Sequence, residues 1–216
     1  MESEDATRHG HRTWLVVAAE RREFDGILKR WGPPARLEWP AEFACEVERN
    51  GDRWLLIANG PGPRLVEQAL EKRIEVNGII STGFCGALDP RLRVGDIVRD
   101  RIHSSDRVAV TTSEKSRLRE QTGAAAVDME SGVLSRKAAE WGVAFYAIRA
   151  VSDRAEEDMP LDFNTYRDSA GRFSRARIAL AALSRPFTAI PALLRLDRNC
   201  RLAAESLGDF FADCRL

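Results

Sequence analysis

The 216-residue chain has few of the side chains that build metal centres or histidine-dependent active sites. It contains three His and four Cys, and no two Cys are spaced as in a CxxC motif. A zinc site needs about four N or S ligands close together, and a Ser-His-Asp or Cys-His hydrolase needs an imidazole on the core scaffold. Two His lie near the N-terminus and His103 lies in a charged, surface-like stretch. We therefore expect no metal site, and catalysis that depends on carboxylates and Arg.

Other absences concern partners and compartment. Basic and acidic residues balance at 33 each, which argues against a broad nucleic-acid surface. The chain has no run of about 18 apolar residues that could span a membrane, and its first residues show no apolar segment typical of a signal peptide. The scattered Cys are expected to be reduced. These features predict a cytoplasmic protein without a nucleic-acid partner.

Apolar runs of strand length alternate with segments of helical spacing. The runs 13–19, 76–83 and 143–151 are typical of buried strands, and 43–47 and 53–59 form a hairpin around Asn50-Gly51. Shorter strands are expected at 94–98, 108–111 and 124–127, and helices at 20–31, 60–74, 113–121 and 128–141. The alternation predicts a three-layer α/β/α sandwich with a mixed, largely parallel central sheet.

The chain is short enough for a single domain. We expect residues 1–12 to be a disordered tail and 13–216 to form that domain, closed by helices over about 173–214. An apolar stripe from Leu193 to Cys214 is typical of a helix docked on the domain. Contact with a partner or a membrane surface is the second interpretation. Pro186 and Pro191 are expected to break the helix before this stripe.

Three clusters follow strands, where parallel sheets place their ligands. In the first cluster, 81–86, the residues 83–86 are expected to form a Gly-rich loop whose backbone N–H groups can approach a ligand. Asp128 and Glu130 fit the start of a helix, or alternatively a carboxylate that binds a vicinal diol. Arg149 inside an apolar strand requires an anionic partner. It would share a face with Asp153 if extended pairing continued that far.

The stretches IISTGFCGALDPRLRVGDIV, AVDMES and FYAIRAVSD, in this order, resemble the nucleoside phosphorylase and nucleosidase superfamily. This group includes purine nucleoside phosphorylases and methylthioadenosine/S-adenosylhomocysteine nucleosidases. The segments TSEK…TGAAAVDMES, IRAVSDRAEEDMP and LSRPFTAIPALLRL look closest to the adenosylhopane-type nucleosidases of hopanoid biosynthesis. The resemblance covers residues 13–185. It implies cleavage of the N-glycosidic bond of a purine nucleoside, specifically a 5′-modified adenosine, with water or inorganic phosphate as co-substrate and no cofactor.

The resemblance also implies roles for individual residues. Asp153 matches the acid that protonates purine N7, and burial would have to keep it protonated near neutral pH. Arg149 matches the Arg near the nucleophile, and Glu20 or Glu23 matches the acid that activates water. Glu130 would bind the ribose hydroxyls, with Met129 against the sugar. The other substrate-binding candidates are Gly83, Phe84, Cys85, Gly86, Ser152 and Phe163, and for Phe163 a core role is an equal alternative.

Two departures from the superfamily pattern bear on the reaction. Phe84 stands where the phosphorylases carry a phosphate-binding Ser, and Phe cannot donate a hydrogen bond; hydrolysis is therefore favoured over phosphorolysis. The segment 99–127 is shorter than in relatives, which predicts a pocket that is open, defective or completed by a second subunit of a homodimer. A phosphate-using phosphorylase and a non-catalytic nucleoside-binding protein are the alternatives. A lipid-like substrate would also suit peripheral membrane contact through the C-terminal helices.

Overall fold

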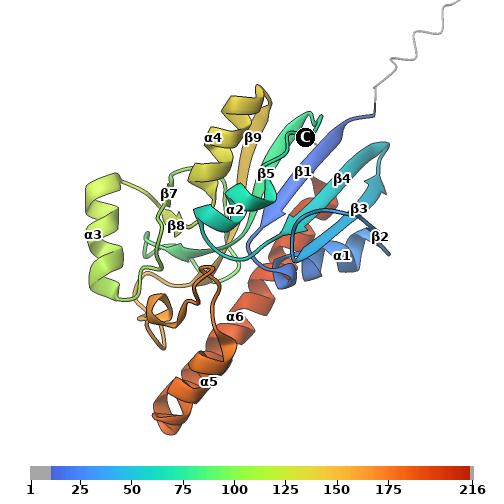
Figure 1. Ribbon diagram of the computed structural model, residues 1–216. Coiled ribbons are helices and arrows are strands. Elements are labelled where there is room, and N and C mark those ends of the chain that lie inside the picture. Colours follow the sequence, from blue (N-terminus) through green and yellow to red (C-terminus); the bar gives the residue numbers. More distant parts are fainter. Residues whose placement is uncertain (1–10, 215–216) are drawn as a thin grey trace, which may run out of the picture.

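A mixed β-sheet runs through the centre of the protein (Figure 1). The computed structural model describes residues 11–214. The strand order is β2-β3-β4-β1-β5-β8-β7, with β9 paired to β5 and β6 paired to β9. The strands are β1 (Thr13–Ala18), β2 (Ala35–Arg36), β3 (Phe43–Arg49), β4 (Asp52–Ala58), β5 (Gly78–Ala87), β6 (Ile97–Val98), β7 (Ile102–Ser104), β8 (Ala126–Asp128) and β9 (Ala144–Asp153).

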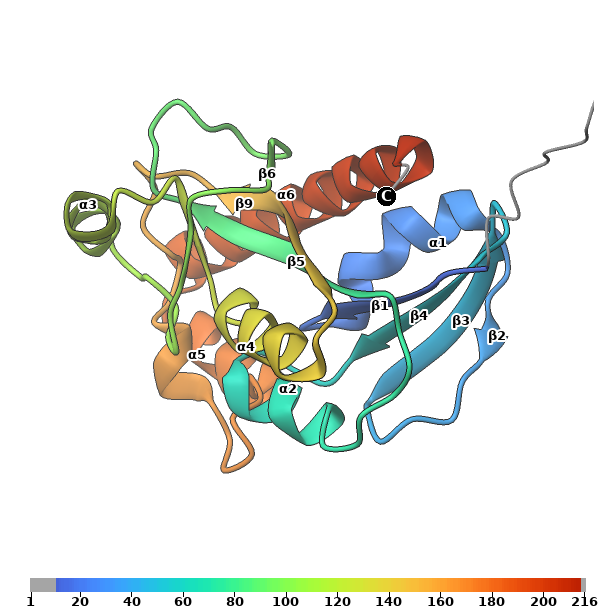
Figure 2. The same ribbon diagram turned by 90° about the horizontal axis from the view of Figure 1, so that it is seen from above.

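Helices cover both faces of this sheet. Figure 2 shows α1 and α6 on one side and α2 and α4 on the other. The helical segments are η1 (Arg21–Phe24), α1 (Asp25–Trp31), α2 (Pro63–Ala69), α3 (Thr112–Thr122), α4 (Ser131–Trp141), η2 (Phe163–Tyr166), α5 (Arg175–Leu183) and α6 (Pro186–Asp213). The predicted three-layer α/β/α fold with a mixed, mostly parallel sheet is confirmed.

Two of the hydrophobic clusters explain why β1 is apolar from Trp14 to Ala18. Trp14 and Val16 pack in the cluster that contains residues of α1 and α6. Leu15 and Val17 belong to the cluster that contains residues of α2 and α4. Successive side chains of a strand point to opposite faces, and here both faces are covered, so the strand has no polar side.

The parallel strands β1, β5 and β9 end at the same edge of the sheet. The Gly-rich segment 83–86, predicted as a loop, is part of β5, because its backbone pairs with β9. A register shift between Cys85 and Gly86 places Gly86 opposite Asp153. Strand β9 also continues to Asp153, so the extended pairing on which the Arg149–Asp153 prediction depended is present.

Several predicted boundaries were wrong. The helix expected at 20–31 is divided into η1 and α1, and α2 ends at Ala69 rather than near Ile74. The segment 108–111 is not a strand, and β7 was missed. Pro186 begins α6 and Pro191 lies inside it. The predicted break at Pro186 is present, because α5 ends at Leu183 and α6 begins at Pro186, where the missing N–H is dispensable. The predicted break at Pro191 was wrong.

The second half of α6 packs against the domain, as the favoured interpretation of the apolar stripe predicted. Cys200, Ala203, Leu207 and Phe211 are buried there. The first half of α6 and α5 form a helical hairpin that projects away from the sheet (Figure 1). Of the predicted N-terminal tail, residues 1–10 lie outside the described residues.

Candidate active site

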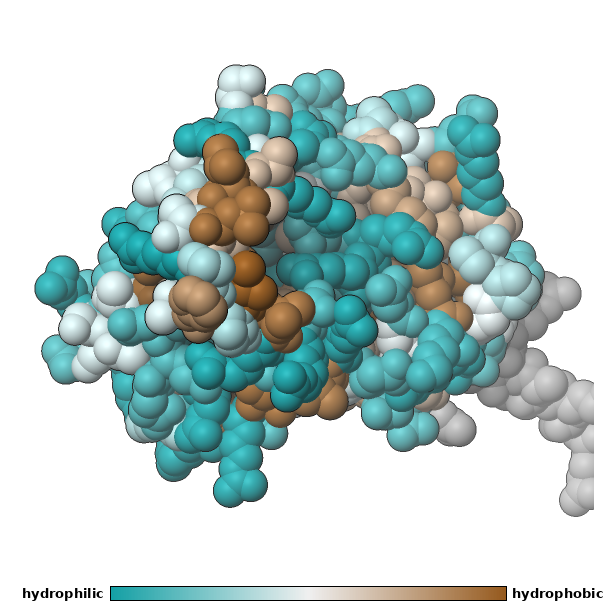
Figure 3. All heavy atoms as spheres, turned by 90° about the horizontal axis from the view of Figure 1, so that it is seen from below, coloured by the Kyte–Doolittle hydropathy of each residue, from teal (hydrophilic) through white to brown (hydrophobic). Residues whose placement is uncertain are grey.

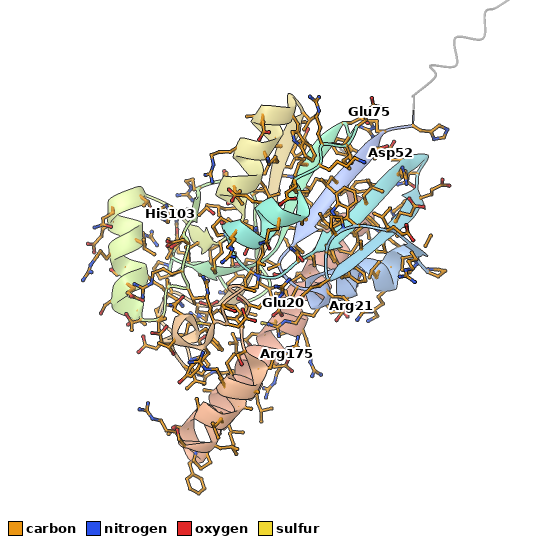
Figure 4. All side chains as sticks on the ribbon, viewed as in Figure 1. Glu20, Arg21, Asp52, Glu75, His103 and Arg175 are labelled. Carbon is orange, nitrogen blue, oxygen red and sulfur yellow. The ribbon has the colours of Figure 1, made fainter. Side chains whose placement is uncertain are left out.

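A cavity of about 770 Å³ lies at the carboxyl ends of β1, β5 and β9. Ten of the residues predicted from the sequence line it: Glu20, Glu23, Phe84, Cys85, Gly86, Met129, Glu130, Ser152, Asp153 and Phe163. Glu20 and Arg21 lie just after β1, and Arg175 at the start of α5 also lines the cavity (Figure 4). The volume is within the ordinary range for a small-molecule site.

Arg149 lies behind the cavity and is fully buried. Its Nη2 atom is 2.7 Å from Asp128 Oδ2 and 3.3 Å from Glu130 Oε2, and it donates to Ser81 Oγ at 2.6 Å. The anionic partner required by a buried Arg is therefore supplied by the protein itself. Asp128 also accepts a hydrogen bond from the backbone N–H of Ser131, so it serves both the helix start and the charge cluster.

Glu130 is buried between this cluster and the loop before α2. Its Oε1 atom accepts a hydrogen bond from the backbone N–H of Gly62 at 2.9 Å. Burial raises the pKa of Glu130, Asp128 adds to the effect, and Arg149 opposes it. Met129 lines the cavity beside Glu130, and its sulfur lies 3.4 Å from Arg167 Nη2. This carboxylate has a fixed orientation and reaches the cavity, which suits an acceptor for hydroxyl groups.

The two candidate acids near β1 have different surroundings. Glu23 is buried, and its carboxylate accepts hydrogen bonds from the backbone N–H groups of Phe84 at 2.6 Å and Glu20 at 2.8 Å. Burial raises the pKa of Glu23 to about 7; Glu130 contributes, and Arg149 opposes the shift. The Glu20 side chain is partly exposed and pairs with Arg22 at 2.7 Å. A carboxyl group that titrates near neutrality is suited to general-base catalysis.

Gly83 allows Glu23 and Arg149 to approach each other. It has a φ of 124°, a conformation that favours glycine, and a Cβ here would collide with the Glu23 carboxyl group. The Nε and Nη1 atoms of Arg149 are buried without a hydrogen-bond partner among the described residues. Arg149 Nη1 lies against the same Cβ position as the Glu23 carboxylate. The glycine therefore lets the Glu23 carboxylate and Arg149 Nη1 both lie close to the backbone of β5.

Asp153 is held from two sides. Its Oδ1 atom accepts a hydrogen bond from Ser152 Oγ at 2.9 Å, and its Oδ2 atom accepts one from Lys115 Nζ at 2.6 Å. A Cβ on Gly86 would lie 3.0 Å from Asp153 Oδ2, so the glycine leaves room for the carboxylate. The role of Lys115 was missed in the sequence analysis. The only signal was that Lys occupies four positions in a chain whose basic residues are otherwise Arg.

The rest of the cavity wall combines apolar and charged side chains. Phe163 and Phe173 both line it, with ring centroids 5.9 Å apart, and the helical hairpin adds Ile178 and Leu196. The short 99–127 segment also contributes to the wall, through Arg107, Val108 and Ala109. Phe84 lines the cavity next to Arg22, whose guanidinium carbon lies 5.6 Å from the centre of the Phe84 ring.

Within residues 11–214, no three His, Cys, Asp or Glu side chains are placed to hold a metal ion. His103 lies on β7 and is not among the residues that line the cavity (Figure 4). The four Cys are free thiols, three of them buried. No described helix combines the length and hydrophobicity that crossing a membrane requires.

Known proteins share both the sequence pattern and the fold. Residues 100–184 match the family model described as the Phosphorylase superfamily. A 5′-methylthioadenosine/S-adenosylhomocysteine nucleosidase of Treponema pallidum is 32% identical over 102 residues, which cover 46% of this chain and 38% of that protein. The matched segment thus spans well under half of the curated relative.

Solved structures match almost the whole chain. A 5′-methylthioadenosine/S-adenosylhomocysteine nucleosidase of Neisseria meningitidis, in complex with methylthio-immucillin-A, has a TM-score of 0.69 at 18% identity, covering 93% of this chain and 97% of that one. The corresponding nucleosidase of Helicobacter pylori gives 0.68 at 15% identity, covering 94% and 97%. A futalosine hydrolase of Helicobacter pylori gives 0.67 at 14%, covering 93% and 95%. Together these matches confirm the predicted resemblance to the superfamily.

Proposed function

We propose that this chain, which has the fold of the nucleoside phosphorylase superfamily, cleaves the N-glycosidic bond of a purine nucleoside with water. The observation that carries the proposal is the convergence of Glu23, Glu130 and Asp153 on one cavity. The Treponema pallidum relative is named as a nucleosidase, and one of the solved relatives contains a nucleoside analogue. A phosphorylase and a non-catalytic binder are the less favoured alternatives.

Each carboxylate has a task that its surroundings support. Glu130 accepts hydrogen bonds from the ribose hydroxyls, with Met129 against the sugar. Asp153 faces the purine and delivers a proton to N7, which turns the base into a better leaving group. Glu23 takes a proton from the attacking water, and the nearby carboxylates stabilise the positive charge that develops on the ribosyl group. In this assignment Glu20 helps to hold the η1 segment and is not the base.

The charge around the nucleophile supports water rather than phosphate. Arg149 is surrounded by the carboxylates of Asp128, Glu130 and Glu23, so a phosphate dianion would meet an excess of negative charge. Phe84 adds no hydrogen-bond donor through its side chain. Arg21 and Arg22 at the cavity wall are the groups that could still attract phosphate, which makes the comparison with and without phosphate part of the test.

We propose a 5′-modified adenosine with a bulky apolar 5′ group as the substrate class, as the hopanoid-type resemblance implies. Ile178 and Leu196 of the hairpin, and Phe173 just before it, support the proposal because they add apolar side chains to a wall that also contains Arg175 and Asp197. The resemblance also carries our proposal of a homodimer, and we propose a cytoplasmic location. The free thiols are in keeping with a reducing compartment.

A panel of 5′-substituted adenosines tests the function. The purified protein is incubated with adenosine and with 5′-alkylthio derivatives of increasing chain length, with and without inorganic phosphate, and free adenine is measured. We expect phosphate-independent release that increases with the apolar 5′ chain. Release of a sugar phosphate would reassign the reaction to phosphorolysis, and calorimetric binding without turnover would favour the non-catalytic alternative.

The projecting helical hairpin supports our proposal of peripheral contact with an anionic membrane. Leu180, Leu183 and Leu194 are exposed, and Phe187 at the start of α6 is 92% exposed. Figure 3 views the end from which the hairpin projects and shows hydrophobic side chains gathered beside a hollow in the surface. Residues 173–198 contain five Arg and a single acidic residue. An apolar surface flanked by Arg suits anionic lipid.

Vesicle sedimentation separates the possible occupants of this surface. We expect the protein to bind phosphatidylglycerol vesicles and not phosphatidylcholine vesicles. Phe187→Ser should weaken the binding, whereas Leu202→Ser, an exposed control on the docked half of α6, should not. Dissociation of a dimer by Phe187→Ser without any vesicle binding would instead identify the surface as a subunit contact.

A further inference from the structure

Lys115 is a buried charged side chain that the proposed reaction has not yet used. It lies on α3 and is 1% exposed. Its Nζ atom donates to Asp153 Oδ2 at 2.6 Å, to the Arg154 carbonyl at 2.6 Å and to the Glu157 carbonyl at 2.8 Å. An ammonium has three donors, and all three are matched here. The charged form of Lys115 is therefore built into the fold at the carboxylate proposed to protonate the base.

The local sequence fixes the position of the Lys115 amine. Thr111 and Glu114 form a capping box at the start of α3, so the helix begins at a fixed residue and Lys115 emerges from its first turn. The loop after β9 supplies the two carbonyl groups. Burying a Lys costs free energy unless the side chain is paired and hydrogen-bonded. An ion pair with a purely structural role would not need to lie at the cavity. This pair instead opens on the cavity through Asp153.

The Lys115–Asp153 pair determines which group can supply a proton to the leaving base. Asp153 accepts from Lys115 through one oxygen and from Ser152 through the other, which is the hydrogen-bonding pattern of an ionised carboxylate. A carboxylate alone has no proton to give to N7. The nearest proton donor with a full charge is the Lys115 ammonium.

We propose that Lys115 is the positioning residue that stores the proton which Asp153 delivers to the purine. This proposal rests on the proposed function. As the C1′–N9 bond breaks, its electron pair stays with the base, N7 takes a proton through Asp153, and Lys115 becomes a neutral amine. The oxygen of water bonds to C1′, and its surplus proton goes to Glu23. Exchange with solvent returns that proton to Lys115, so one water is consumed and the enzyme is restored.

Other titratable groups also lie near the Lys115–Asp153 pair. Cys85 on β5 and Cys200 on α6 lie within electrostatic range of Asp153. Burial raises the pKa of both thiols, that of Cys200 to about 12. Neither thiol therefore carries a charge near neutral pH. The Arg154 side chain is exposed, and Glu157 meets Lys115 through its backbone carbonyl.

The pH dependence of kcat for adenine release tests the proposal in Lys115→Met. The wild type should stay active to alkaline pH because an ammonium holds the proton. In the variant Asp153 must hold it alone, and a carboxyl group ordinarily titrates well below an amine. We expect a loss of about 30-fold at pH 8 that shrinks to less than about threefold at pH 5. The exposed control Lys72→Met should behave like the wild type.

Two outcomes would overturn the proposal: a wild-type profile in Lys115→Met, or an equal loss at every pH, since the latter indicates a purely structural role. A double-mutant cycle in thermal unfolding is independent of activity. Lys115→Met should lower the melting temperature, and adding Asp153→Asn should recover part of the loss; independent effects would disprove the coupling. If the wild type releases no base at all, the proposed function fails while this cycle still tests the pair.

Discussion

The two ends of the cavity balance their charges differently. Around Arg149 one cation faces the carboxylates of Asp128, Glu130 and Glu23. Around Asp153 one carboxylate faces one ammonium, that of Lys115, at 2.6 Å. In the first arrangement burial raises the pKa of Glu23 to about 7, while Arg149 opposes the shift and Glu130 adds to it. The second is neutral as a pair. One fold can thus keep a base at the nucleophile and a proton at the leaving group.

Among the substitutions that change the charge balance at either end of the cavity, Asp153→Asn should reduce kcat most. The amide keeps the shape of the side chain but cannot relay a proton, so we expect kcat for adenine release to fall about 1000-fold. The measurement is single-turnover release of adenine from the best substrate of the panel. Thermal unfolding controls for the fold, because Lys115 loses its partner. Near-normal turnover would show that the base is protonated elsewhere.

Glu23→Gln should have the second-largest effect, at the other end of the cavity. Only the ionised carboxylate accepts a proton from water, so wild-type activity should rise as the pH rises through about 7, the raised pKa of Glu23. The variant should lose about 100-fold in kcat, and its activity should no longer rise as the pH passes through about 7. Glu20→Gln is the matched control and should change kcat less than about threefold. The reverse ranking of the two variants would make Glu20 the base.

The same pKa makes a prediction about stability. The folded-state pKa of Glu23 is raised from 4.5 to about 7, mainly by burial, so between these pH values the folded state binds more protons than the unfolded state. The contribution of Glu23 to the free energy of unfolding must therefore fall as the pH rises through that window. Chemical denaturation of wild type and Glu23→Gln from pH 4.5 to 8 should show a steeper decline in the wild type. Parallel curves would mean that Glu23 is solvated.

Most of the layered fold could be predicted from the sequence, because strands buried on both faces are apolar throughout. The ends of β5 and β9 could not. Gly83 and Gly86 are typical of a loop by propensity, yet pairing with β9 holds them in a strand. The short β7 depends on its partner β8, and no local pattern specifies it.

The residues of the candidate site also divide into some that could be predicted from the sequence and others that could not. Arg149 was predicted because a charged residue in an apolar strand demands a partner. Glu130, and either Glu20 or Glu23, were predicted from the resemblance to the superfamily. Lys115 lies in a polar helix 38 residues before Asp153, and only the tertiary fold brings the two together. The choice between Glu20 and Glu23 likewise depends on which side chain the fold buries.

Phe84→Ser should have the smallest effect and sharpens the comparison at the nucleophile end. The hydroxyl restores a hydrogen-bond donor where phosphorylases carry one, but the carboxylates around Arg149 still oppose a phosphate dianion. We therefore expect hydrolysis to fall less than about fivefold, through the lost contact with Arg22, and no sugar phosphate to form. Mass spectrometry of the products in phosphate buffer checks this. If the sugar phosphate does form, the side chain at position 84, rather than the surplus of carboxylates, selects water as the nucleophile.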